Sequence, residues 1–241
     1  MQFGWRSRFR RAEPLTAGCE WFALLSRASS LVRSACVPAA PRWLAGYRAA
    51  DYGQWVTSAI VIGVVAKTGS AVTVALSGPA TAPRFRARRE IELIPPGLAV
   101  QPYHAAAGMD LAAAGELIAQ VESAAEEAAA AGLRAVAAAV PASAVRAVAV
   151  VVKAVSVPGH LADILRSHAW MHAAEGVLYR QTVLAAATEC GWAARAVEQA
   201  ALPAAEQALN TLGQAAGRPW RRIEKDATRA ALTLLTAADD D

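Results

Sequence analysis

The chain has 241 residues, of which 55% are hydrophobic and 18% charged, so it can bury one substantial core and is too apolar for an intrinsically disordered protein. Its formal charge of +4 is uneven. Residues 1–50 hold eight Arg and two Glu, a net of +6, and the remaining 191 residues hold 16 Lys and Arg against 18 Asp and Glu, a net of −2. A near-neutral body excludes a broad electrostatic footprint for nucleic acid but still allows a local basic groove.

The basic start of the chain predicts an arm outside the core. Its Arg-rich sequence is interrupted by Glu20, Arg27 and Arg33, which leaves no apolar stretch for a secretory signal. We therefore expect a poorly ordered basic N-terminal arm over residues 1–55 and one α/β domain over residues 56–241.

The cysteines and the apolar runs suggest where the protein works. Cys19, Cys36 and Cys190 are widely spaced and form no CxxC motif, which fits a reducing cytoplasm. The longest apolar runs reach about half of the roughly 20 residues that a membrane-spanning helix needs. We expect a cytoplasmic protein with no membrane span.

The domain opens with a pattern typical of three strands. The apolar run over residues 58–66 predicts a central strand, and Gly69 with Ser70 predicts a turn into a second strand over residues 71–76. Residues 88–94 alternate charged and apolar side chains, which indicates an edge strand with one wet face.

Helices and strands alternate in the rest of the chain. Asp110 is placed as the N-cap of an Ala-rich helix that Pro141 should stop. The remaining expected elements are a strand over 145–152, one long helix from about 160 to 189, a strand over 192–197, and two helices over about 203–216 and 219–237, with Pro203 and Pro219 in their first turns.

This order of elements, βββαβαβαα, predicts a mixed five-stranded sheet of order 3-2-1-4-5 with helices on both faces, because crossovers between parallel strands are right-handed. The order resembles the ribonuclease-H-like superfamily and, within it, the RuvC-type resolvases. In addition, the stretches QPYHAAAG and RSHAWMHAAEG resemble segments of actinobacterial proteins. This second resemblance does not point to any particular activity.

The resemblance implies a nuclease that holds two Mg²⁺ with acidic side chains, one of them an Asp in the first strand. Here the matching segment is Gly63-Val64-Val65, and residues 58–66 contain no acid. Glu175, Glu224 and Asp226 remain as candidates for the other ligands. A two-metal nuclease of the usual type is therefore disfavoured, and Mg²⁺ is implied only if cleavage is retained.

The segment RSHAWMHAAEG offers different chemistry. His168, His172 and Glu175 fall at i, i+4 and i+7 and share one helix face. Ala169 stands where a zinc peptidase needs its general-base Glu, which argues against peptidase chemistry. A His-His-Glu metal site, an acid/base site, and a packed helix in which Glu175 pairs with Arg180 all remain compatible with the spacing.

Two lysines are expected beside these residues, and a third histidine is a separate candidate for ligand binding. Lys67 and Lys153 follow the first and fourth strands, which should be neighbours, and ligand sites in open sheets favour such strand ends. His104 is expected in the loop after the third strand. Ammonium groups repel a bare cation, so we expect an anionic ligand rather than a tightly bound metal.

These observations favour a RuvC-like nucleic-acid-binding protein whose metal-dependent cleavage is weak or lost. The alternative is a non-enzymatic interaction or scaffold module on the same fold. We expect Glu175, His172 and His168 to carry any catalysis, Lys67, Lys153 and His104 to bind a ligand, and no residue to bind a metal. Nucleic acid and further copies of the chain are the partners that this interpretation allows.

Overall fold

The computed structural model describes residues 59–140 and 145–239. The expected basic arm over residues 1–55 lies outside the described residues, as does Pro141, so both remain predictions. Within the described part of the chain, no helix is both long and apolar enough to cross a membrane.

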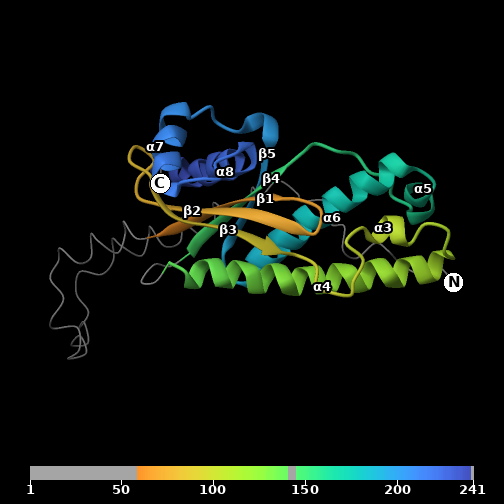
Figure 1. The fold of residues 1–241 in the computed structure, drawn as a ribbon. Helices are drawn as coiled ribbons and strands as arrows, with labels where there is room; N and C mark the ends of the chain where they lie inside the picture. Colours follow the sequence, from red (N-terminus) through yellow and green to blue (C-terminus); the bar gives the residue numbers. More distant parts are fainter. Residues whose placement is uncertain (1–58, 141–144, 240–241) are drawn as a thin grey trace, which may run out of the picture. The chain divides into compact units, whose positions relative to one another are not determined.

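Five strands form one mixed sheet of order β3-β2-β1-β4-β5 (Figure 1). β1 pairs antiparallel with β2 and parallel with β4, β2 pairs antiparallel with β3, and β4 pairs parallel with β5. The predicted mixed five-stranded sheet of order 3-2-1-4-5 is thus confirmed. The strands are β1 (Ile60–Ala66), β2 (Ser70–Ser77), β3 (Arg84–Glu92), β4 (Val145–Val152) and β5 (Ala193–Glu198).

Helices cover both faces of the sheet (Figure 1). On β1, Ile60, Ile62 and Val64 join the core beneath α4 and α6, whereas Val61 joins the core beneath α8. This alternation follows from the two-residue period of a strand. The helices are α3 (Pro102–Ala105), α4 (Leu111–Ala138), α5 (Leu161–Leu165), α6 (His168–Glu189), α7 (Glu206–Ala216) and α8 (Arg222–Asp239), with a 3₁₀ turn at Gln199–Ala201.

Three predicted boundaries were wrong, and each has a local cause. The long helix expected over 160–189 is two helices, because Ser167 is extended and its hydroxyl accepts a hydrogen bond from the Trp170 amide at 3.4 Å, which starts α6 afresh. His104 lies on the single helical turn α3 rather than in a loop. β3 begins at Arg84, four residues earlier than predicted, because it pairs along the whole of β2.

The two terminal helices begin after the prolines expected in their first turns. α7 begins at Glu206, after Ala205 adopts a left-handed conformation with φ of 48°. Before α8, the Arg88 guanidinium donates hydrogen bonds to the carbonyls of Gly217 at 3.1 Å, Arg218 at 3.2 Å and Pro219. These contacts hold the segment on β3, so helix formation begins only at Arg222.

Candidate metal centre

The first turn of α6 places two imidazoles on one face. His168 is the first residue of the helix, directly after the N-cap Ser167, and His172 follows one turn later. Both side chains are exposed. The predicted i, i+4 pair is thus present, and it lies at the solvent-facing start of the helix.

The short helix α3 brings a third imidazole to this pair. Buried Pro102 and Tyr103 anchor α3, and the Tyr179 hydroxyl of α6 donates a hydrogen bond to the Val100 carbonyl just before it. These contacts fix the segment against α6. His104, the next residue after Tyr103, is therefore held beside α6 by buried neighbours.

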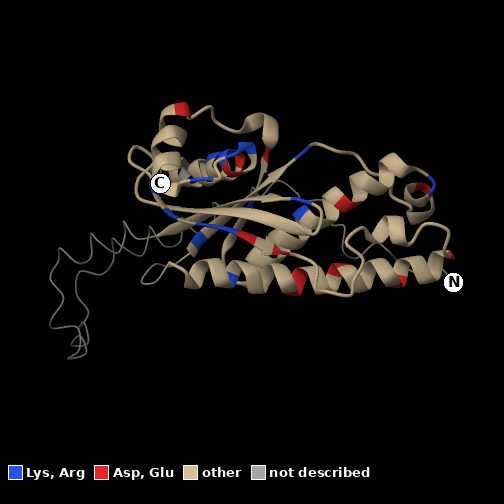
Figure 2. Cartoon of the chain, in the orientation of Figure 1, with Lys and Arg blue, Asp and Glu red and all other residues tan. Residues whose placement is uncertain are grey.

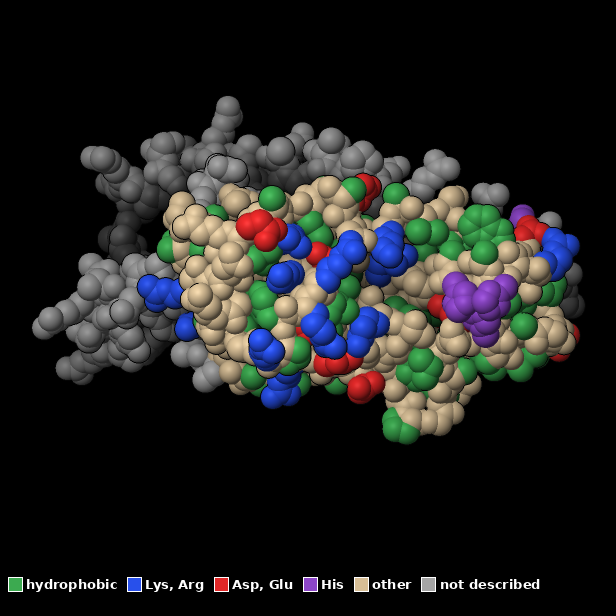
Figure 3. All heavy atoms as spheres, turned by 45° about the horizontal axis from the view of Figure 1, so that its top comes forward, with side chains coloured by type: hydrophobic (Ala, Val, Ile, Leu, Met, Phe, Trp, Pro, Cys, Tyr) green, Lys and Arg blue, Asp and Glu red, His purple; other side chains and the backbone are tan. Residues whose placement is uncertain are grey.

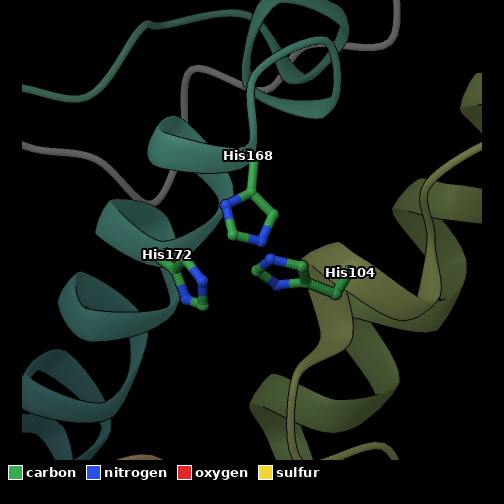
Figure 4. A group of neighbouring side chains, drawn as sticks. All are labelled: His104, His168 and His172. Atoms are coloured by element: carbon green, nitrogen blue, oxygen red, sulfur yellow. The ribbon is translucent and has the colours of Figure 1, made fainter.

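The three imidazoles face one another (Figure 4). The ring centroid of His104 lies 4.9 Å from that of His168 and 4.4 Å from that of His172, and the latter two lie 4.5 Å apart. One ring nitrogen from each residue can be chosen so that all three lie within 4.8 Å of one another. Within residues 59–140 and 145–239, this is the one group of three or more His, Cys, Asp or Glu side chains that could share a metal ion.

Glu175 lies beneath the three rings and contacts two of them. Its side chain is 3% exposed, with Oε1 2.8 Å from His104 Nδ1 and Oε2 3.7 Å from His172 Nδ1. Gln101 Nε2 and the His104 backbone amide donate to the same carboxylate at 3.5 Å and 3.4 Å. Glu175 therefore pairs with histidine, and the pairing with Arg180 that the sequence left open is not formed.

The contact with Glu175 sets the tautomer of His104. The Glu175 carboxylate accepts a hydrogen bond from Nδ1 of His104, so in the neutral ring the lone pair is on Nε2. Nε2 is buried and has no hydrogen-bond partner among the described residues. A buried, unpartnered nitrogen of this kind is costly unless something binds it.

The two lysines of the predicted site have other surroundings. β1 and β4 are parallel neighbours, so Lys67 and Lys153 do follow adjacent strand ends. Lys67 forms an ion pair with Glu90, and hydrogen bonds from Lys67 and Ser70 hold the pKa of the Glu90 carboxyl below its usual range. Lys153 is exposed and pairs with no described residue. A ligand shared by these lysines and the histidines stays a prediction.

Glu224 and Asp226 of α8 are paired with arginines. Glu224 is buried and accepts hydrogen bonds from Arg221 Nη2 at 3.1 Å and from the Arg221 amide at 2.9 Å. Burial raises the pKa of Glu224, but these bonds outweigh it and lower the pKa overall. Asp226 lies 3.0 Å from Arg229 Nη1 and 3.6 Å from Arg222 Nε.

Comparisons with known proteins add two distant structural neighbours. No protein-family model and no curated protein matches the chain. RuvC from Thermus thermophilus in complex with a Holliday junction substrate is 18% identical, with a TM-score of 0.44, covering 76% of this chain and 96% of that one. Another structure of Thermus thermophilus RuvC is 18% identical, with a TM-score of 0.41, covering 75% and 96% of the two chains.

Proposed function

We propose that this protein binds a divalent transition-metal ion through the imidazoles of His104, His168 and His172. The observation that carries the proposal is the state of His104. Its Nδ1 is held by the Glu175 carboxylate, and its buried Nε2 has no partner among the described residues. A carboxylate behind a ligating histidine orients the ring and raises its basicity, as is common at metal sites.

The ligand set favours zinc or a similar ion. Imidazole suits zinc, copper, nickel and iron, and three histidines leave a fourth position for water or a substrate. Zn–N bonds of 2.0–2.1 Å require ligating nitrogens about 3.3 Å apart in a tetrahedral site. The exposed rings of His168 and His172 can rotate to reach that spacing. This proposal replaces our expectation of no metal, because that expectation did not place His104 beside His168 and His172.

Magnesium at the position that the nuclease resemblance implies, over the first strand and the last helix, has no comparable support. Mg²⁺ takes oxygen ligands, and the Glu224 and Asp226 carboxylates are held by Arg221, just before α8, and by Arg229 on α8. When bound to the three histidines, a transition metal would act as a Lewis acid and lower the pKa of a water in its fourth position. The histidine patch reaches the surface, so such a water would be accessible to a substrate (Figure 3).

We expect the purified protein to bind one equivalent of zinc with the affinity of a three-histidine site. His104→Ala and His172→Ala should each abolish stoichiometric binding, because two imidazoles cannot fill the coordination sphere. Glu175→Gln keeps the size of the side chain but loses its charge, and we expect it to weaken zinc binding about 10–100-fold. Titration against a competing chelator and metal analysis after gel filtration measure both effects.

His160→Ala is the matched control, because the chain has four histidines and His160 is the one that lies outside the cluster. It precedes α5, is exposed, and makes no capping hydrogen bond through its side chain. This variant should bind zinc like the wild type. Equal zinc binding by the wild type and the His104→Ala variant, or none by either, would refute the proposed centre.

A second candidate function, RuvC-like binding of nucleic acid, is favoured by a basic hollow on another part of the molecule. Arg218, Pro219, Trp220 and Arg221 line an open hollow of ≈ 630 Å³ that precedes α8. Lys and Arg residues also lie on β3 and α8 (Figure 2), and basic side chains gather on one face of the molecule (Figure 3). Arginine side chains suit phosphate contacts, and the half-buried Trp220 lies between them in the sequence.

We expect weak binding of a labelled single strand and of a four-way junction at low salt, measured by fluorescence anisotropy. Arg218→Gln should reduce affinity several-fold and lower the slope of log K against log salt by about 0.7–0.9, as for one lost phosphate contact. Arg134→Gln is the control, because Arg134 is exposed, pairs with Glu189, and lies on α4. No binding at low salt would favour the scaffold module instead.

A further inference from the structure

Arg180 lies on the same helix as two of the three histidines, and its guanidinium has an unusual position. His172, Gly176 and Arg180 follow one another at intervals of four residues along α6, so each is the neighbour of the one before it on the helix surface. A Cβ atom added to Gly176 would lie 3.3 Å from Arg180 Nη1. The guanidinium therefore reaches back over Gly176, toward His172, and occupies the place of the missing side chain.

This guanidinium has no partner among the described residues. Arg180 is half-buried and forms no ion pair or hydrogen bond with them, and burial lowers its pKa. Other described arginines of similar burial are paired, as Arg229 is with Asp226 and Glu206. A half-buried cation without a counter-charge is poised to bind an anion.

We propose that Arg180 and the metal centre bind one oxyanion together, of the phosphoryl or carboxylate class. One oxygen would take the open position of the metal, and another would accept hydrogen bonds from the guanidinium. This inference rests on the proposed metal centre and names the ligand that the centre takes.

The spacing fits such a bridging ligand. Side chains four residues apart on a helix have Cβ atoms about 5–6 Å apart, so the guanidinium over Gly176 lies roughly one such step from His172. A phosphoryl group presents oxygens in divergent directions and can span a metal and an arginine. The forked donors of arginine match such oxygens better than a single ammonium does.

Inorganic phosphate is the probe, and the cobalt-loaded protein reports on the open position. We expect phosphate to change the visible absorption of bound Co²⁺ and to bind the zinc-loaded protein in calorimetry. Arg180→Gln should weaken phosphate binding at least about tenfold, the loss of one charge-assisted contact of about 1.4 kcal/mol. It should leave the metal stoichiometry unchanged.

Two further variants sharpen the test. Gly176→Leu fills the space that the guanidinium occupies, so it should weaken phosphate binding as Arg180→Gln does while zinc is retained. Arg166→Gln is the control, because Arg166 is exposed, precedes α6 and is already paired with Asp163. It should bind phosphate like the wild type.

The outcomes separate the two proposals. Zinc binding with equal phosphate affinity in the wild type and Arg180→Gln would overturn the oxyanion site and leave the metal centre standing. A wild-type protein that binds no metal would remove the metal centre, and with it the bridging site. Phosphate binding that depends on both zinc and Arg180 supports the inference.

Discussion

Replacing Gly63 by alanine is expected to lower the free energy of unfolding by about 3 kcal/mol or more, at the upper end of the cost of overpacking a core. Gly63 lies in the middle of β1, and α8 crosses it so closely that an added Cβ would lie 1.8 Å from the Ala227 carbonyl oxygen and 2.7 Å from the Ala231 nitrogen. These are backbone atoms of a helix, so they cannot move aside as a flexible side chain could. The helix must shift away from the sheet.

Gly159→Ala is the matched control for this prediction. Gly159 lies before α5, has no atom within 4 Å of an added Cβ, and needs no left-handed conformation. Its replacement should change the free energy of unfolding by no more than about 0.5 kcal/mol. Urea denaturation of both variants measures the difference, and a Gly63→Ala protein as stable as the wild type would show that α8 does not pack against β1 in this way.

The close approach of α8 also bears on the nuclease resemblance. Ala227 and Ala231 are the residues of α8 that approach Gly63, and both are buried and small enough to let the helix lie against the strand. The strand itself offers no acid over residues 60–66, and Glu224 and Asp226 of α8 are paired with arginines. Among the described residues, the side chains that could bind a metal together lie instead where α3 meets α6.

The sheet could be predicted from the sequence because its signals are local and consistent. Buried strands such as residues 60–66 and 145–152 are almost entirely apolar, with Arg146 as the one charged residue, and right-handed crossovers leave few ways to order them. The helix break at Ser167 was missed, because a serine in an otherwise helical pattern becomes an N-cap only when the backbone before it turns away.

The candidate site was only half predictable for a similar reason. His168, His172 and Glu175 are tied by helix spacing, which the sequence shows directly. His104 is 64 residues before His168, and its place depends on Tyr103 being buried and on Tyr179 binding the Val100 carbonyl. No short pattern encodes these contacts, so the third imidazole appears only once the chain is folded.

A second large effect is expected at high pH. Burial, followed by the charges of Glu122 and Glu175, raises the pKa of Tyr103 to about 12, and burial with the charge of Glu175 raises that of Tyr179 to about 12. Tyrosine in an unfolded chain has a pKa near 10, so between about pH 10 and about 12 the unfolded state has lost protons that the folded state still holds. Stability is therefore full below about pH 10 and falls as the pH rises toward 12.

The loss should be on the order of 3 kcal/mol for each tyrosine by pH 12, since one pKa unit corresponds to about 1.4 kcal/mol. Urea denaturation at a series of pH values between 9 and 12 measures it, and phenolate absorbance follows ionisation. Tyr103→Phe and Tyr179→Phe should each remove one share of the pH dependence. Because Glu175 raises both pKa values, Glu175→Gln should lower them and make the fall in stability with pH shallower. If the double phenylalanine variant shows an unchanged fall in stability, the alkaline instability belongs to other groups.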